Sequence, residues 1–169
     1  MENYLELIKC KVIIKLNTKK ISPQSFLIAE DIEKTDIFSK FPQMDIILAN
    51  NTFEHLKNPE KIIQQCSKKL SKKGYLVIRV PNLSCLQLKY YTLIGKKKNW
   101  ICYKDPTHIS IYTVKKWKKI LENNGFKVKI IGFPPTIFLK KVMNKLNIYP
   151  TFKPFYLFNN SIVFQCQKI

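Results

Sequence analysis

Glycine is scarce in this sequence. Four of its 169 residues are glycine, and the first of them is Gly74. A loop whose backbone closely approaches a bound nucleotide depends on glycine, because any other residue carries a Cβ that obstructs the approach. A glycine-rich ligand-binding loop is therefore excluded from the part of the chain that precedes Gly74.

Arginine is almost absent, although the chain is strongly basic. The sequence has 30 lysines and arginines against 11 acidic residues, a formal charge of +19, and Arg79 is its single arginine. Such a charge suits RNA, DNA or an anionic membrane surface, but arginine is the residue that best contacts phosphates and bases. Lysine, isoleucine and asparagine are all abundant, which indicates a compositional bias of the source genome. The composition therefore argues against nucleic acid as a partner, and we expect lysines on several faces without a deep basic groove.

Patterns typical of metal sites are also missing. The sequence has two histidines and five cysteines, and no two cysteines form a C-x-x-C pair. A dedicated zinc site is therefore not expected, nor is any other metal site. An odd, scattered set of cysteines favours reduced thiols and a cytoplasmic location.

Long apolar runs are absent too. No run reaches the length needed to cross a bilayer, and the N-terminus lacks the charged-then-apolar layout of a signal peptide. The length, the 46% hydrophobic content and the lack of an internal repeat or linker favour a single domain over residues 1–169.

The clearest structural signal is a strand–helix–strand pattern. Met44–Ala49 and Tyr75–Val80 are apolar runs that predict buried strands. An Asn-Pro pair predicts a helix from about Pro59 to Leu70, and Ser71 to Gly74 closes it. We expect a right-handed βαβ unit whose two strands are adjacent and parallel.

The remaining elements are predicted from shorter signals. Glu2–Lys9 suggests the end of a helix, and an N-cap at Thr113 with a stop at Gly125 predicts another helix. Further expected elements are strands at Val12–Leu16, Phe26–Ala29, Phe126–Ile131 and Ser161–Cys166, and a short helix at Ile137–Leu146.

Polar residues gather where the two strands of the βαβ unit end. Asn50, Asn51, Glu54 and His55 follow the first strand, and Asn82 follows the second. Ligands of parallel α/β sheets bind beyond the carboxyl ends of the strands. The sequence therefore predicts a ligand site at this edge.

Several motifs of this region resemble one enzyme family. The run Asp45–Pro59 with its Glu-His-Leu sequence, the Lys-Gly turn and the strand ending Val-Pro-Asn resemble the second half of class I S-adenosylmethionine-dependent methyltransferases. Asp105–His108, then Tyr112-Thr113, then a helix ending Asn-Gly-Phe are similar to the same family in the same order. The resemblance covers roughly residues 11–133, the carboxyl-terminal two-thirds of such an enzyme.

The resemblance implies a fold and a reaction. The fold is an α/β, Rossmann-like, mostly parallel sheet with flanking helices, truncated at the N-terminus, with an antiparallel last strand. The reaction is methyl transfer from S-adenosylmethionine to a small molecule or to a glycan or lipid precursor. The alternative is a non-catalytic binding subunit whose basic surface contacts nucleic acid or an anionic membrane.

On the cofactor side, the resemblance assigns three residues. Asp31 matches the acidic position near the adenine, and Asn50 and Asn51 complete the cofactor pocket at the end of the fourth family strand. The alternative for all three residues is a purely local role in forming turns.

On the substrate side, the resemblance assigns four residues. Glu54 and His55 would act as a general base and its neighbour, and His108 and Tyr112 would line the substrate mouth. The alternatives are that His55 caps or packs locally and that His108 and Tyr112 anchor a loop.

Three features depart from the family. The glycine-rich loop is missing, the strand that would precede it is missing, and Lys15 stands where an acid would hold the ribose. A lysine donates hydrogen bonds but cannot accept them from hydroxyls. Three losses of about 1 kcal/mol each weaken binding by about a hundredfold or more. We therefore expect very weak or no binding of S-adenosylmethionine, as in a gene fragment, a mis-started chain or a degenerate homologue.

Aromatic residues surround a lysine run in a long, irregular segment between residues 82 and 113. They are Tyr90, Tyr91, Trp100 and Tyr103, around Lys96–Lys98. A substrate-side cap or a peripheral membrane contact would use them, and the alternative is an insertion that packs its aromatics onto the domain.

Overall fold

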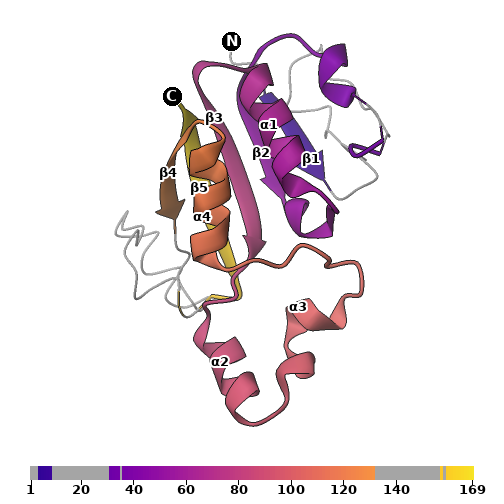
Figure 1. Ribbon diagram of the computed structural model, residues 1–169, viewed down its shortest axis with the longest axis vertical. Coiled ribbons are helices and arrows are strands. Elements are labelled where there is room, and N and C mark those ends of the chain that lie inside the picture. Colours follow the sequence, from indigo (N-terminus) through magenta and orange to yellow (C-terminus); the bar gives the residue numbers. More distant parts are fainter. Residues whose placement is uncertain (1–3, 9–30, 35, 132–156, 158) are drawn as a thin grey trace, which may run out of the picture.

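The computed structural model describes residues 4–8, 31–34, 36–131, 157 and 159–169. Its described part contains a five-stranded sheet in the order β1-β2-β3-β5-β4 (Figure 1). The strands are β1 (Tyr4–Ile8), β2 (Met44–Asn50), β3 (Leu70–Pro81), β4 (Phe126–Ile131) and β5 (Ser161–Lys168).

Strand direction confirms the predicted fold class. β1, β2 and β3 pair in parallel, and β5 pairs antiparallel with both β3 and β4. Four strands therefore run in one direction and the last one runs against them. This is the Rossmann-like, mostly parallel sheet with an antiparallel final strand.

The predicted βαβ unit is present. Helix α1 (Pro59–Lys69) joins the parallel neighbours β2 and β3, and the Asn58 side chain caps it by accepting from the Lys61 N–H at 3.1 Å. Ile62, Ile63 and Cys66 recur at helical spacing and form its buried face. The helix and the sheet thus share one core, as the periodicity indicates.

The turn after α1 differs from the prediction. Ser71 to Gly74 do not form a separate closing turn, because β3 already begins at Leu70. The pairing with β2 shifts register between Met44 and Ile46, and Lys73 has a φ of 66°. A bulge therefore absorbs the extra residues within the strand. A Cβ at Gly74 would lie 3.0 Å from two backbone oxygens, so this position needs glycine.

Strand β1 corrects two expectations. Glu2–Lys9 was expected to end a helix, but Tyr4–Ile8 forms a strand parallel to β2. A short apolar run fits either element, and the free edge of β2 decides in favour of a strand. The strand that was expected to be missing beside β2 is therefore supplied by β1. The strands predicted at 12–16 and 26–29 and the helix predicted at 137–146 lie outside the described residues, as does Lys15.

Helix α4 (Val114–Asn123) confirms the second predicted helix. The Thr113 hydroxyl accepts from the Lys116 N–H at 3.2 Å, and Gly125 ends the helix with a φ of 81°. Trp117 is buried against the sheet core. Helices α1 and α4 lie on the same face of the sheet, and α4 leads into β4 as predicted (Figure 1).

The segment after β3 is more regular than expected. It contains α2 (Leu86–Leu93), η3 (Lys97–Asn99) and α3 (Ile101–Lys104), which lie beyond the carboxyl end of β3 (Figure 1). This lobe has a small core of its own, formed by Cys85, Leu88, Trp100 and Cys102. The other short helices are η1 (Ile37–Lys40) and η2 (Phe53–His55). Of the helices among the described residues, none has the length and apolarity to cross a membrane.

The described cysteines are free thiols inside the protein. Cys66, Cys85, Cys102 and Cys166 are buried and unbridged. Burial raises the pKa of Cys102 to about 12 and raises the pKa of the other three thiols as well. These thiols therefore stay protonated and unreactive in the folded protein.

The two faces of β2 offer a test of this fold. Ile47 is fully buried and Ile46, its neighbour on the opposite face, is half-buried. Ile47→Ala should lower the free energy of unfolding by about 2–5 kcal/mol through loss of burial and a cavity, and Ile46→Ala should lower it by less. Urea denaturation of both variants checks this, and equal losses would contradict the assignment of faces.

Candidate active site

The carboxyl end of β2 leads directly into a buried turn. Asn50 and Asn51 are exposed, and the Asn51 N–H donates to the Arg79 carbonyl of β3 at 3.0 Å. Asn51 adopts a φ of 50°, a left-handed conformation that asparagine tolerates well. The chain then turns inward, and Phe53 and Leu56 become fully buried. Their burial draws the two polar residues between them into the protein.

Those two residues are Glu54 and His55. Glu54 is 1% exposed and His55 is 8% exposed. A His55 ring nitrogen, Nε2, lies 4.0 Å from Oε1 of the Glu54 carboxylate. The predicted catalytic pair is therefore a contact pair inside the protein, close to the end of β2.

A second segment, residues 105–112, is tied to this turn. The Ile109 and Ser110 N–H groups both donate to the Glu54 carbonyl at 2.9 Å, and the Ser110 hydroxyl donates to the Leu56 carbonyl at 2.7 Å. These bonds join positions more than fifty residues apart in the sequence. They place His108 next to His55.

The two histidines of the chain form a pair. The ring centroids of His55 and His108 are 4.7 Å apart. Nδ1 of His108 lies 2.7 Å from the Cys102 carbonyl, and Nδ1 of His55 lies 3.1 Å from the Thr107 carbonyl. A carbonyl only accepts hydrogen bonds, so both Nδ1 atoms carry a proton. In the neutral rings, Nε2 is then the atom with the lone pair.

Asp105 organises the second segment. Its carboxylate accepts from the Thr107 N–H at 2.9 Å and from the Thr107 hydroxyl at 2.5 Å. Because that hydroxyl donates to Asp105, its oxygen accepts from His55 Nδ1 at 2.8 Å. The other carboxylate oxygen lies 3.7 Å from His108 Nε2. Asp105 thus contacts one histidine and positions the other through Thr107.

Three side chains that could act as metal ligands come together here. Glu54, His55 and His108 each offer one donor atom, and these atoms all lie within 4.8 Å of one another. Two histidines look too few for a metal site in the sequence, but folding brings both of them to one carboxylate.

Tyr112 contacts residues of α4 and the 105–112 segment. Its ring packs against Trp117 at 5.0 Å between centroids, and the Lys116 ammonium lies 3.5 Å from the Tyr112 ring centroid. Its hydroxyl contacts the Ser110 hydroxyl at 3.4 Å. The predicted role of Tyr112 at the substrate mouth stays a prediction, and its visible contacts are those of an anchor for the 105–112 segment.

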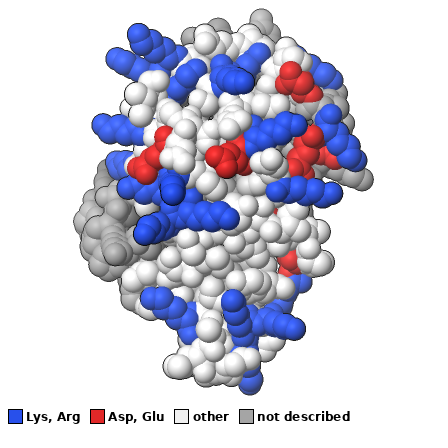
Figure 2. Space-filling view, in the orientation of Figure 1, with Lys and Arg blue, Asp and Glu red and all other residues white. Residues whose placement is uncertain are grey.

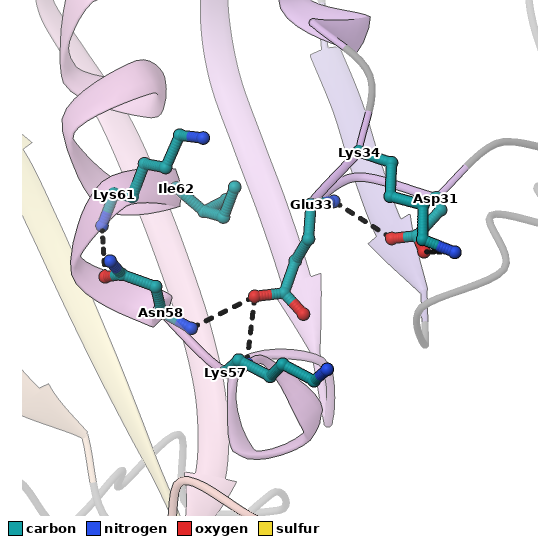
Figure 3. Close-up of a pocket in the computed structure, with 7 residues that line it drawn as sticks. All are labelled: Asp31, Glu33, Lys34, Lys57, Asn58, Lys61 and Ile62. Atoms are coloured by element: carbon teal, nitrogen blue, oxygen red, sulfur yellow. Dashed lines mark hydrogen bonds and ion pairs between the residues drawn. The ribbon is translucent and has the colours of Figure 1, made fainter.

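Asp31 lies at a different place. Its carboxylate accepts from the Glu33 N–H at 3.0 Å and lies 3.4 Å from the Lys34 ammonium (Figure 3). These two groups hold the pKa of the Asp31 carboxyl below its usual value. Asp31 lines a pocket of about 440 Å³ between its own turn and the start of α1. Neither Asn50 nor Asn51 is among the described residues that line this pocket.

Several residues of the site were missed by the sequence analysis. Glu33 accepts from the Lys57 and Asn58 N–H groups at 2.9 and 3.0 Å, which ties the Asp31 turn to the start of α1 (Figure 3). Thr107 and Ser110 connect the histidine segment. Only Thr107 had a readable signal, because an aspartate two residues earlier favours a local side-chain turn.

A methyltransferase model matches most of the chain. The family described as a methyltransferase domain aligns with residues 10–129. The chain belongs to this methyltransferase family. No curated protein matches the sequence.

Solved methyltransferase structures share the fold. An enzyme from Archaeoglobus fulgidus, described as a SAM-dependent methyltransferase, is 20% identical with a TM-score of 0.59, over 99% of this chain and 86% of that chain. A SAM-dependent methyltransferase from Thermotoga maritima is 18% identical with a TM-score of 0.53, over 76% of this chain and 57% of that chain. The plantazolicin methyltransferase BpumL, solved with SAH and a triazolic desmethylPZN analog, is 19% identical with a TM-score of 0.54, over 97% and 67%.

These comparisons confirm the family resemblance. By this resemblance, the cofactor of the chain is S-adenosylmethionine. The chain spans less than two-thirds of the Thermotoga protein. The individual roles of the site residues stay predictions.

The tie between the two segments can be tested with two serines. Ser110→Ala should lower the free energy of unfolding by about 1–3 kcal/mol, because it leaves the buried Leu56 carbonyl without this donor. Ser39 also donates its hydroxyl to a backbone carbonyl, that of Asp36 at 2.6 Å, but it is exposed. Ser39→Ala should change the same free energy by less than about 0.5 kcal/mol. Chemical denaturation compares them, and equal effects would contradict a structural tie at Ser110.

Proposed function

We propose that this chain transfers a methyl group from S-adenosylmethionine to a small molecule or to a glycan or lipid precursor. The observation that best supports the proposal is the buried contact between Glu54 and His55, with His108 beside it, at the carboxyl end of β2. In parallel α/β sheets this end of the strands is where ligands bind. A structural pair alone would not require two histidines and a carboxylate in one place.

Residues at two separate places would contact the cofactor. Asn50 and Asn51 present exposed amide side chains at the end of β2. The pocket beside Asp31, at about 440 Å³, lies within the usual range of roughly 300–1,000 Å³ for small-molecule sites. Asn50 and Asn51 would hydrogen-bond the cofactor at the end of β2, and Asp31 would do so from its separate pocket. The cofactor supplies a methyl carbon activated by a sulfonium.

Glu54 and His55 would handle the proton of the acceptor. With Nδ1 bound to the Thr107 carbonyl, the neutral His55 ring has its lone pair at Nε2. His55 would take the acceptor proton at Nε2, and the Glu54 carboxylate 4.0 Å away would stabilise the resulting positive charge. His108 would border the acceptor on the other side.

The affinity for the cofactor is reduced less than the sequence alone suggests. The sequence analysis expected one strand to be missing, whereas β1 pairs with β2. Two of the three losses then remain, the glycine-rich loop and the acid replaced by Lys15. At about 1 kcal/mol each, they weaken binding by about thirtyfold.

Calorimetric titration with S-adenosylmethionine tests the proposal. We expect a dissociation constant about thirtyfold above the micromolar range. Asn50→Ala should weaken binding by a further factor of about five through loss of one hydrogen bond. Asp36→Asn, which changes an exposed carboxylate outside the pocket, should leave it unchanged.

The outcomes distinguish the proposed function from the predicted loss of cofactor affinity. No binding at millimolar cofactor, or an unchanged affinity in Asn50→Ala, would contradict the proposed function. A micromolar constant for the unaltered chain would retain the function and show that another segment replaces the lost loop.

A membrane contact is the second candidate, and the α2–α3 lobe favours it. Leu93 is 86% exposed and Tyr90 is 60% exposed on helix α2 of this lobe. Lys96, Lys97 and Lys98 follow directly and are exposed. Figure 2 shows lysines around the lower lobe as well as over the upper and middle parts of this face. Apolar side chains beside several ammonium groups fit an anionic membrane surface.

Vesicle sedimentation tests this contact. The protein should bind vesicles containing phosphatidylserine, and added salt should weaken the binding because the lysines act through screened charge. Leu93→Ser should reduce the partition coefficient about tenfold, from a loss of about 1.5 kcal/mol of apolar insertion. Ile169→Ser is the matched control, because Ile169 is 85% exposed outside the lobe. Equal effects of the two substitutions, or equal binding to neutral vesicles, would contradict the membrane contact. Salt-sensitive binding of RNA without binding of vesicles would favour nucleic acid as the partner.

A further inference from the structure

The Glu54–His55–His108 cluster has the arrangement of a metal site. One donor atom from each residue lies within 4.8 Å of the other two. Two histidines and a carboxylate form a common ligand set for Zn²⁺ and other divalent first-row transition metals. We propose that Glu54, His55 and His108 bind one such ion, for which Zn²⁺ is the representative.

The hydrogen bonds behind the two rings support this proposal. Metal-binding histidines usually donate the N–H of the non-ligating nitrogen to a carbonyl or carboxylate, which fixes the ring and its tautomer. His108 Nδ1 lies 2.7 Å from the Cys102 carbonyl, and His55 Nδ1 lies 3.1 Å from the Thr107 carbonyl. In both rings Nε2 is therefore the nitrogen that an ion would bind. A pair of histidines that only filled space would not need the same nitrogen anchored twice.

The distances are those of a site that closes around its ion. Bonds of about 2.0–2.2 Å at tetrahedral angles place ligand atoms roughly 3.4 Å apart. His55 Nε2 and Glu54 Oε1 are 4.0 Å apart, and the widest separation in the cluster is at most 4.8 Å. The required contraction is roughly 1 Å, which side-chain torsions can supply. Three protein ligands leave a further position open for water or for an acceptor atom.

The surrounding charge is compatible with a dication. Glu54 is buried beside both histidines, and Asp105 reaches His108 Nε2 at 3.7 Å from the outside. An ion at the cluster would take the place of the Asp105 contact at that nitrogen. It would also take the lone pair of His55 Nε2, so a bound ion and a general base at His55 exclude each other. In the metal-bound protein the acceptor would instead lose its proton to water while coordinated to the ion.

Two histidines in the whole chain make the test direct. In ¹⁵N-¹H spectra of the full-length protein, both Nε2 signals should shift on addition of one equivalent of Zn²⁺, while both Nδ1 atoms stay protonated. Cobalt(II) should give a tetrahedral or five-coordinate visible spectrum without the sulfur-to-metal charge-transfer band of a thiolate ligand. His108→Gln, His55→Gln and Glu54→Gln should each weaken Zn²⁺ binding more than tenfold. Substituting a residue that only hydrogen-bonds to a metal ligand already weakens metal affinity by about 10–100-fold.

A matched carboxylate variant controls for general effects. Glu122 is an exposed glutamate paired with Lys118 at 3.5 Å, so Glu122→Gln should bind Zn²⁺ as the unaltered chain does. Far-UV circular dichroism establishes whether each variant is folded. If a variant does not fold, the ¹⁵N-¹H and Co²⁺ spectra of the unaltered protein test the metal site. Unshifted histidine signals, a thiolate band with Co²⁺, or equal losses in Glu122→Gln would overturn the proposal. These measurements contain no S-adenosylmethionine, so a negative result would overturn the metal site alone. The proposed methyl transfer is tested separately by the calorimetric titration.

Discussion

The site depends on the burial of one short turn. Phe53 and Leu56 follow the end of β2 and are completely inside the protein, and they carry Glu54 and His55 in with them. Buried polar groups are costly unless they are hydrogen-bonded. The 105–112 segment meets this requirement for three groups of the turn, by donating to the backbone carbonyls of Glu54 and Leu56 and by accepting from the His55 ring. A loop that enters from far along the chain is therefore part of the site by physical necessity.

The same contacts explain why both histidines meet. Ile109 and Ser110 bind one carbonyl, and His108, directly before them, lies against His55. Each ring is held from behind by a backbone carbonyl. The rings are thus oriented by main-chain atoms, and their Nε2 atoms lie beside the carboxylates of Glu54 and Asp105. A general base and a metal ligand set are two mutually exclusive uses of this one arrangement.

The lobe beyond β3 is held by its own small core and by hydrogen bonds to the residues before β5. Trp100 is its buried centre, and its indole N–H donates to the Asn160 side chain at 3.3 Å, just before β5. Asn82 is tied to the same segment, since its N–H donates to the Asn160 carbonyl at 2.9 Å and its side-chain amide to the Asn159 carbonyl at 3.0 Å. The lobe is therefore tied to the segment before β5, while Leu93 and Tyr90 on α2 remain exposed. An anchored lobe with exposed apolar side chains beside lysines suits contact with a surface more than closure over a substrate.

Local sequence signals determined much of the fold. The Asn58-Pro59 start of α1, the Thr113 cap and Gly125 stop of α4, and the apolar runs of β2 and β3 rest on periodicity and backbone chemistry within a few residues. The sequence also indicated where the site lies, because β2 ends at Asn50 and ligands bind beyond such ends. These features need no knowledge of distant residues.

Tertiary structure decided the rest. Tyr4–Ile8 became a strand because β2 offers an edge, and the turn at Ser71 to Gly74 became a bulge because β3 begins early. Asp31 lines a pocket whose described residues do not include Asn50 or Asn51, and His55 meets His108 across more than fifty positions. Contacts of this kind depend on how elements pack in space, and spacing along the chain carries no measure of that distance. The two histidines look too few for a metal site in the sequence, whereas the fold places both beside one carboxylate.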